Sequence, residues 1–146
     1  MMNKKHGYRL GLAYRNDKEK SYFEHLQEKL DNSSFSTLEQ MLTFPLYVSR
    51  QAMATFLFKY ELFKNVLNVH GSIIECGVAY GGGVMSFAQF SAILEPVNYT
   101  RKIIGFDTFE GFPDIVPQDS GDDSHNKEGG VKVESYGELL DCIKLY

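Results

Sequence analysis

Hydrophobic side chains recur at helical spacing through much of the first half of the chain. A helix is predicted from Asp17 to Leu30, with Asp17 or Ser21 as its N-cap, and residues 1–16 are predicted as a loose basic arm. The run Ser36-Thr37-Leu38-Glu39 matches a capping box, so a short helix is expected to begin there. Pro45 is expected to end it.

The longest helical pattern runs from Leu46 to about Val69. Two apolar stripes along it predict a helix that is buried on more than one side, and Gly71 occupies the position of a C-terminal glycine cap. The stripes comprise Met53, Phe56, Leu57, Tyr60, Phe63 and Leu67, and Val48, Ala52, Leu62 and Val66.

From Ser72 onward, short apolar runs alternate with a glycine-rich turn and a helical pattern. Residues 73–76 and 103–106 are predicted strands, residues 77–83 a turn and residues 84–95 a helix. This order is typical of the opening unit of a doubly wound α/β fold, and a right-handed crossover would make the two strands parallel neighbours. A last helix is predicted from Tyr136, and the acidic segment 111–130 is expected to be solvated or lid-like.

The fold class is therefore predicted as α/β and Rossmann-like, preceded by helices. Residues 1–70 would form a helical amino-terminal segment, and residues 71–146 the first part of the Rossmann-like domain. Each βαβ unit needs about 30 residues, which leaves room for only two or three strands. Open parallel sheets usually have more, so the chain is expected to be an amino-terminal portion of something longer, with a sheet edge available for self-association.

Composition excludes several classes of partner. The 146 residues include 15 basic and 19 acidic side chains, a net charge of −4 that argues against nucleic-acid binding. No apolar run is long enough to span a bilayer, and no secretory signal is visible. The two cysteines, Cys76 and Cys142, form neither a disulfide framework nor a metal knuckle, so a reduced, cytoplasmic protein is expected.

The candidate chemistry lies at the ends of the two predicted strands. Glu75 and Asp107 flank a glycine-rich turn that opens a helix, and a carboxylate at the end of the second strand can accept both hydroxyls of a ribose. The P-loop and dinucleotide fingerprints are absent. Since Glu75 would repel a pyrophosphate but attract a cation, S-adenosylmethionine fits better than a dinucleotide.

Two longer strings carry a family resemblance. IIECGVAYGGGVMSFAQF, followed by KIIGFDTFEGFP, resembles the TylF-like (macrocin O-methyltransferase) family of S-adenosylmethionine-dependent enzymes. The resemblance implies that residues 75–79 border the methionine part of the cofactor, that Asp107 binds its ribose and that residues 108–111 flank its adenosine. The implied cofactor-binding residues are Glu75, Gly77, Val78, Ala79, Gly81, Asp107, Thr108, Phe109, Glu110 and Gly111.

The same resemblance implies an O-methyltransferase acting on a sugar hydroxyl of a small molecule or glycoside. Mg²⁺ is expected in the family, but its ligands and the catalytic base have no counterpart in this sequence, so no catalytic or metal-binding residue is assigned. Two alternatives stay open: a non-catalytic fragment, which could form a homo-oligomer through its sheet edge, and a Rossmann-type protein that binds NAD through Asp107.

Overall fold

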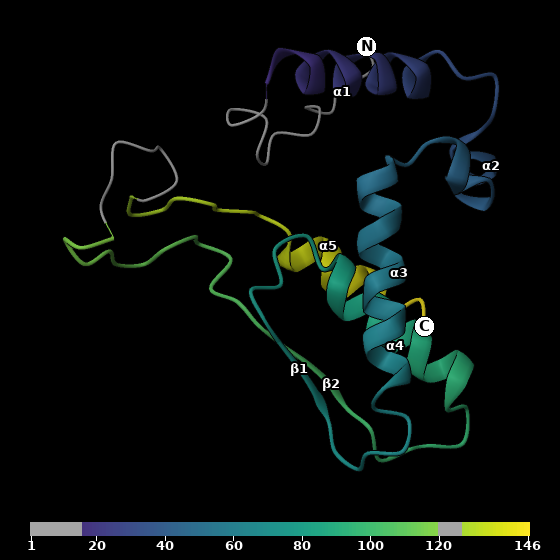
Figure 1. Ribbon diagram of the computed structural model, residues 1–146, viewed down its shortest axis with the longest axis vertical. Coiled ribbons are helices and arrows are strands. Elements are labelled where there is room, and N and C mark those ends of the chain that lie inside the picture. The colour runs from purple at the N-terminus through teal and green to yellow at the C-terminus, as the bar shows by residue number, and fades with distance from the viewer. Residues whose placement is uncertain (1–15, 120–126) are drawn as a thin grey trace. The chain divides into compact units, whose positions relative to one another are not determined.

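The computed structural model describes residues 16–119 and 127–146 (Figure 1). It divides into two compact units, Met1–Met53 and Ala54–Tyr146, and each is described by itself. The predicted basic arm and the middle of the acidic segment lie outside the described residues, apart from Asn16. The predicted domain boundary at residues 70 and 71 marks the change from helices to strands and stays a prediction.

The amino-terminal unit is built from capped helices, α1 (Asp17–Asp31) and α2 (Thr37–Leu42). Asn16, rather than Asp17 or Ser21, is the N-cap of α1 and forms a capping box with Glu19. The capping box predicted at Ser36 is confirmed. Pro45 does not end α2, which stops at Leu42; instead it lies in the first turn of a separate 3₁₀ helix, η2 (Phe44–Leu46).

Helix α3 (Arg50–Lys64) is shorter than the predicted span of 46–69. It starts where the Ser49 hydroxyl accepts the N–H of Ala52 at 3.0 Å. Beyond Lys64 the chain continues in turns, so Gly71 is not its C-cap. The prediction of burial on more than one side is wrong, because Phe63 is the only buried residue of α3. Its ring contacts that of Phe90 in α4 (Gly82–Leu94).

The predicted parallel sheet is confirmed. Strands β1 (Ile73–Cys76) and β2 (Ile103–Phe106) pair in parallel, with Ile73 opposite Ile103 and Cys76 opposite Phe106, and they run alongside each other in Figure 1. Helix α4 connects them, as the βαβ pattern requires. Because Gly77 donates its N–H to the Phe106 carbonyl at 2.8 Å, the pairing continues one residue past the strand ends, into the loop before α4.

Helices α3 and α4 contact the same face of this sheet. Side chains of paired residues share a face, and the face that carries Glu75 and Gly105 meets Lys59 of α3 and Val84 of α4. The opposite face carries Ile74, Cys76, Ile104 and Phe106. Its Ile74 and Phe106 are 60% and 58% exposed.

Arg101, just before β2, fastens the end of α3 to the sheet. Its guanidinium pairs with both carboxylate oxygens of Glu95, at 2.5 and 2.6 Å, and the two side chains are only 3% and 6% exposed. The remaining donors satisfy three backbone carbonyls of the turns that follow α3, those of Val66, Val69 and Gly71. This buried cation therefore links the turns after α3 to the residues that lead into β2.

The last helix, α5 (Tyr136–Ile143), matches the prediction of a helix from Tyr136. Within the ranges 16–119 and 127–146, no helix has both the length and the apolar character needed to cross a membrane.

Candidate functional site

The carboxylate of Asp107 joins the two strand ends. Its Oδ2 accepts the backbone N–H of Ala79 in the loop after β1, at 2.9 Å, and its Oδ1 accepts the N–H of Phe109 at 2.7 Å. One side chain therefore organises both loops at the carboxyl edge of the sheet, where open α/β sheets bind their ligands.

These hydrogen bonds hold the pKa of Asp107 below its usual range. The bond from the Ala79 N–H has the largest effect and the bond from the Phe109 N–H follows, because both stabilise the charged form of the carboxyl. Asp107 is thus an anion at neutral pH. Each carboxylate oxygen has two acceptor positions and Asp107 is exposed, so the carboxylate can accept further hydrogen bonds.

Both residues that donate to Asp107 have a backbone conformation unusual for side-chain-bearing residues. The φ angles of Ala79 and Phe109 are +49° and +56°, in the left-handed region. Such conformations cost about 1–3 kcal/mol and persist only where the surroundings impose them. Here the Asp107 carboxylate supplies part of the constraint, because it accepts the N–H groups of both residues.

The start of α5 completes this corner of the molecule. The hydroxyl of Ser135 donates to the Ala79 carbonyl, and the Tyr136 ring lies 5.2 Å from that of Phe109, centroid to centroid. Leu139 packs against Gly81, which is the N-cap of α4 at a φ of +82°. A Cβ on Gly81 would meet both strain and the Leu139 side chain, which explains the glycine there.

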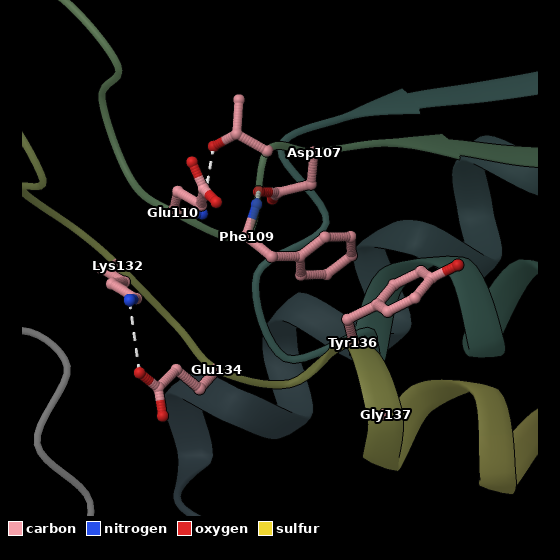
Figure 2. Close-up of a pocket in the computed structure, with 8 residues that line it drawn as sticks. Asp107, Phe109, Glu110, Lys132, Glu134, Tyr136 and Gly137 are labelled. Carbon is pink, nitrogen blue, oxygen red and sulfur yellow. Dashed lines mark hydrogen bonds and ion pairs between the residues drawn. The ribbon is translucent and has the colours of Figure 1, made fainter.

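A pocket of about 580 Å³ opens beside Asp107 (Figure 2). Figure 2 shows the rings of Phe109 and Tyr136 next to each other below Asp107, inclined by 54°. The ion pair of Lys132 and Glu134, 3.2 Å apart, lies at the left of this view. The lining combines flat aromatic surface with acidic groups and one lysine. Its residues are Asp107, Thr108, Phe109, Glu110, Lys132, Glu134, Tyr136 and Gly137.

Glu75, the other predicted carboxylate, lies beneath the first turn of α4 and does not line this pocket. Its Oε1 is 3.6 Å from the Lys59 ammonium. Its Oε2 is buried and has no hydrogen-bond partner among the described residues. A buried carboxylate oxygen without a hydrogen-bond donor is destabilising, so a donor placed beside it would offset that cost.

The other predicted residues have mainly structural positions. Val78 is buried against Gly105, so its side chain belongs to the core. Thr108 closes the turn after β2 by donating its hydroxyl to the Gly111 carbonyl at 2.7 Å. Gly111, at a φ of +82°, passes so close to Gly130 that a Cβ would overlap the Gly130 carbonyl. These residues shape the loops, and their backbones are what a ligand would meet.

The structure therefore brings four predicted residues together around one pocket, Asp107, Thr108, Phe109 and Glu110, and it joins Ala79 to Asp107 directly. It adds a segment, residues 132–137, that sequence reasoning did not assign to the site, because nothing local relates it to Asp107. Lys59 could have been recognised from the sequence as an unusual position, because it is a lone cation in line with Phe56 and Phe63 on an apolar stripe.

Among residues 16–119 and 127–146, no three histidine, cysteine or acidic side chains come together in a way that could hold a metal ion. The residues described here thus provide no fit for Mg²⁺, and no chemistry is assigned to it. What the site offers instead is an anionic hydrogen-bond acceptor beside aromatic surface, suited to a ligand with hydroxyl groups and a flat ring.

Comparison with known proteins gives this geometry a context. The family model of macrocin-O-methyltransferase (TylF) matches residues 61–138, which is more than half of the chain. No curated protein is significantly similar to the chain in sequence.

Two solved structures are similar in fold and in sequence. The crystal structure of CalS11, calicheamicin methyltransferase, matches 95% of this chain and 57% of its own, with 31% identity and a TM-score of 0.78. The apo structure of CalS11, TDP-rhamnose 3'-O-methyltransferase, an enzyme in calicheamicin biosynthesis, matches 65% of this chain and 42% of its own, with 36% identity and a TM-score of 0.61. The chain thus spans about half the length of these structures.

Proposed function

Because the chain belongs to the TylF macrocin-O-methyltransferase family, we propose that it forms the cofactor-binding part of an S-adenosylmethionine-dependent O-methyltransferase. The acceptor would be a hydroxyl group of a sugar-containing small molecule. The second part of this proposal rests on the two structures of CalS11, which is described as a calicheamicin methyltransferase and as a TDP-rhamnose 3'-O-methyltransferase.

The observation that carries the proposal is the Asp107 carboxylate at the mouth of the aromatic pocket. Asp107 directly follows the second strand, is anionic, and lines the same pocket as Phe109 and Tyr136. The ribose hydroxyls of a nucleoside would donate to the free acceptor positions of the carboxylate, and its base would lie against the aromatic surface. Thr108 and Glu110 would border the same nucleoside.

Glu75 gives the second argument. Its unsatisfied buried Oε2 favours a ligand with a cationic donor, and the α-ammonium of S-adenosylmethionine is one. The loop through Gly77 and Ala79, with Gly81 at its end, would carry the methionine part past this carboxylate. A pyrophosphate at this place would be repelled by Glu75, so the family and the charge both favour methyl transfer over the NAD-binding alternative.

When bound, the cofactor supplies an electrophilic methyl group on a positively charged sulfur. The part played by this chain is to hold the nucleoside and the amino-acid ends at fixed positions, so that an acceptor oxygen can approach in line. The acceptor hydroxyl must also lose a proton, and no described residue is assigned that step. The family resemblance leads us to expect Mg²⁺ as well, but no cluster of three histidine, cysteine or acidic side chains among the described residues could hold it. We further propose a cytoplasmic location and no nucleic-acid partner, in keeping with the net charge of −4.

Titration with S-adenosylhomocysteine, followed by calorimetry, tests the proposal. The wild-type chain should bind one equivalent, and Asp107→Ala should bind at least about tenfold more weakly, since a charged acceptor is lost. Asp141→Ala is the matched control, because Asp141 is an exposed residue of α5 that pairs only with Lys144 in the described structure.

Three outcomes are decisive. No binding by the wild-type chain would refute cofactor binding, and equal binding by Asp107→Ala would refute the ribose contact. Tighter binding of NAD than of S-adenosylhomocysteine would favour the oxidoreductase alternative.

Incubation with labelled S-adenosylmethionine and a panel of nucleotide sugars and glycosides then tests methyl transfer. A chain that binds the cofactor without turnover would match the non-catalytic alternative.

A further inference from the structure

Ser135 stands at the N-cap of α5 but does not cap it. A serine at this position normally accepts a backbone N–H of the first helical turn. Here no side-chain cap bond is formed, and the hydroxyl instead donates to the carbonyl of Ala79, 56 positions earlier in the chain. Ser135 is only 7% exposed, so this bond is shielded from water. The residue has exchanged a local bond for a long-range one.

The acceptor of this bond lies in the middle of the loop that precedes α4. The Ala79 N–H is already held by Asp107, so the two peptide groups that flank the Ala79 Cα are fixed by side chains from two other segments. The φ angle of +49° at Ala79 requires such a constraint, since a residue with a Cβ does not adopt it freely. Without Ser135, one of the two supports is gone.

We propose that Ser135 is a positioning residue for the cofactor loop, residues 77–81, and that it sets the affinity for S-adenosylmethionine without touching it. This inference rests on the proposed function for its ligand, but the tie between Ser135 and Ala79 is a property of the ligand-free chain. It makes the loop dependent on the docking of α5.

The rest of the α5 start supports the same coupling. Leu139 packs against Gly81 at the far end of the loop, and Tyr136 lies against Phe109, whose N–H is bound by Asp107. Three segments, the loop after β1, the loop after β2 and the start of α5, thus form a closed ring of contacts around Asp107. Within residues 16–119 and 127–146, the bond of Ser135 is the hydrogen bond that links the start of α5 to the backbone of this loop.

Two measurements on the purified chain test the proposal. The first is hydrogen exchange of the backbone amides in the ligand-free protein, and the second is calorimetric titration with S-adenosylhomocysteine. Ser135→Ala should accelerate exchange at residues 77–83 but not in the later turns of α4, and should weaken binding about five- to tenfold, the effect of one shielded hydrogen bond. Ser135→Thr keeps the hydroxyl and should restore both.

Ser86→Ala is the matched control, because the Ser86 hydroxyl also donates to a backbone carbonyl, that of Gly82, but within α4 itself. It should leave both readouts near those of the wild type. Ser135→Val, compared with the equally shaped Ser135→Thr, provides a second pair in which only the hydroxyl differs. Should Ser135→Ala not fold, this pair decides the matter.

The proposal is overturned if Ser135→Ala and Ser135→Val show wild-type exchange at residues 77–83 and wild-type affinity. It is also overturned if Ser135→Thr is as impaired as Ser135→Ala, because the space around the side chain would then matter rather than the bond. If the wild-type chain does not bind S-adenosylhomocysteine, the proposed function fails, while the exchange measurement still decides whether Ser135 holds the loop.

Discussion

Gly83 lies against the carboxylate of Glu75, so closely that a Cβ on Gly83 would overlap it. The neighbouring Gly82, also in the first turn of α4, has open space where its Cβ would be. The two adjacent glycines therefore differ in what they require. Only Gly83 is needed to let a carboxylate at the end of β1 reach beneath the helix.

We expect Gly83→Ala to displace the Glu75 side chain, because the helix backbone cannot retreat from it. Binding of S-adenosylhomocysteine should be lost or reduced more than about tenfold, as one charged acceptor is moved out of place. Gly82→Ala is the control and should bind like the wild type, with equal or greater stability, since alanine is the better helix former. Equal affinities of the two variants in calorimetry would show that Glu75 does not take part in binding.

A second prediction concerns pH. The Asp107 carboxylate is hydrogen-bonded in the folded state and its pKa is held low, so its contribution to stability is complete above the pKa of the unfolded chain and disappears as the pH falls through the folded value. Asp107→Asn should therefore be less stable than the wild type at pH 7. The difference should shrink as the pH falls below about 4.

Urea denaturation of both proteins across this pH range provides the measurement, with Asp141→Asn as the exposed control. A stability difference between wild type and Asp107→Asn that stays constant from pH 7 to pH 3 would contradict the role assigned to the charged form.

The third prediction concerns the buried pair of Arg101 and Glu95. Arg101→Met should destabilise the chain by about 3–5 kcal/mol, because it leaves the Glu95 charge buried without its partner. It also frees the carbonyls of Val66, Val69 and Gly71. The double variant Arg101→Met with Glu95→Leu should lose less than the sum of the two single losses.

Lys144→Met, which breaks the exposed pair with Asp141, is the control and should change stability little. Additive losses in the double variant, measured by denaturation at pH 7, would show that Arg101 acts through its backbone contacts alone.

Local rules predicted most elements of this chain correctly. The capping box at Ser36, the two strands at residues 73–76 and 103–106, and their parallel pairing all follow from short-range patterns, and the structure confirms them. The wrong predictions concern patterns that are compatible with more than one structure. The apolar stripes of α3 suggested burial on more than one side, but apolar periodicity does not say how many neighbours a helix has, and only Phe63 is buried.

The extent of α3 shows the same limit. Its apolar pattern continues to residue 69, yet the helix ends at Lys64, and the carbonyls of the following turns are taken up by Arg101. That contact joins residues 32 and 35 positions apart in the chain, so it has no local signature.

Sequence patterns alone predict two carboxylates at the ends of neighbouring parallel strands, on either side of a glycine-rich loop, because strand length, periodicity and crossover handedness are local or nearly local properties. The contacts of each carboxylate follow from the tertiary fold: Asp107 accepts the N–H of Ala79, 28 positions away, and Glu75 lies beside Gly83. The tertiary fold alone also brought Ser135 to Ala79, across 56 positions. Such contacts depend on where loops of different length return to the same edge of the sheet, and no pattern of neighbouring residues specifies that.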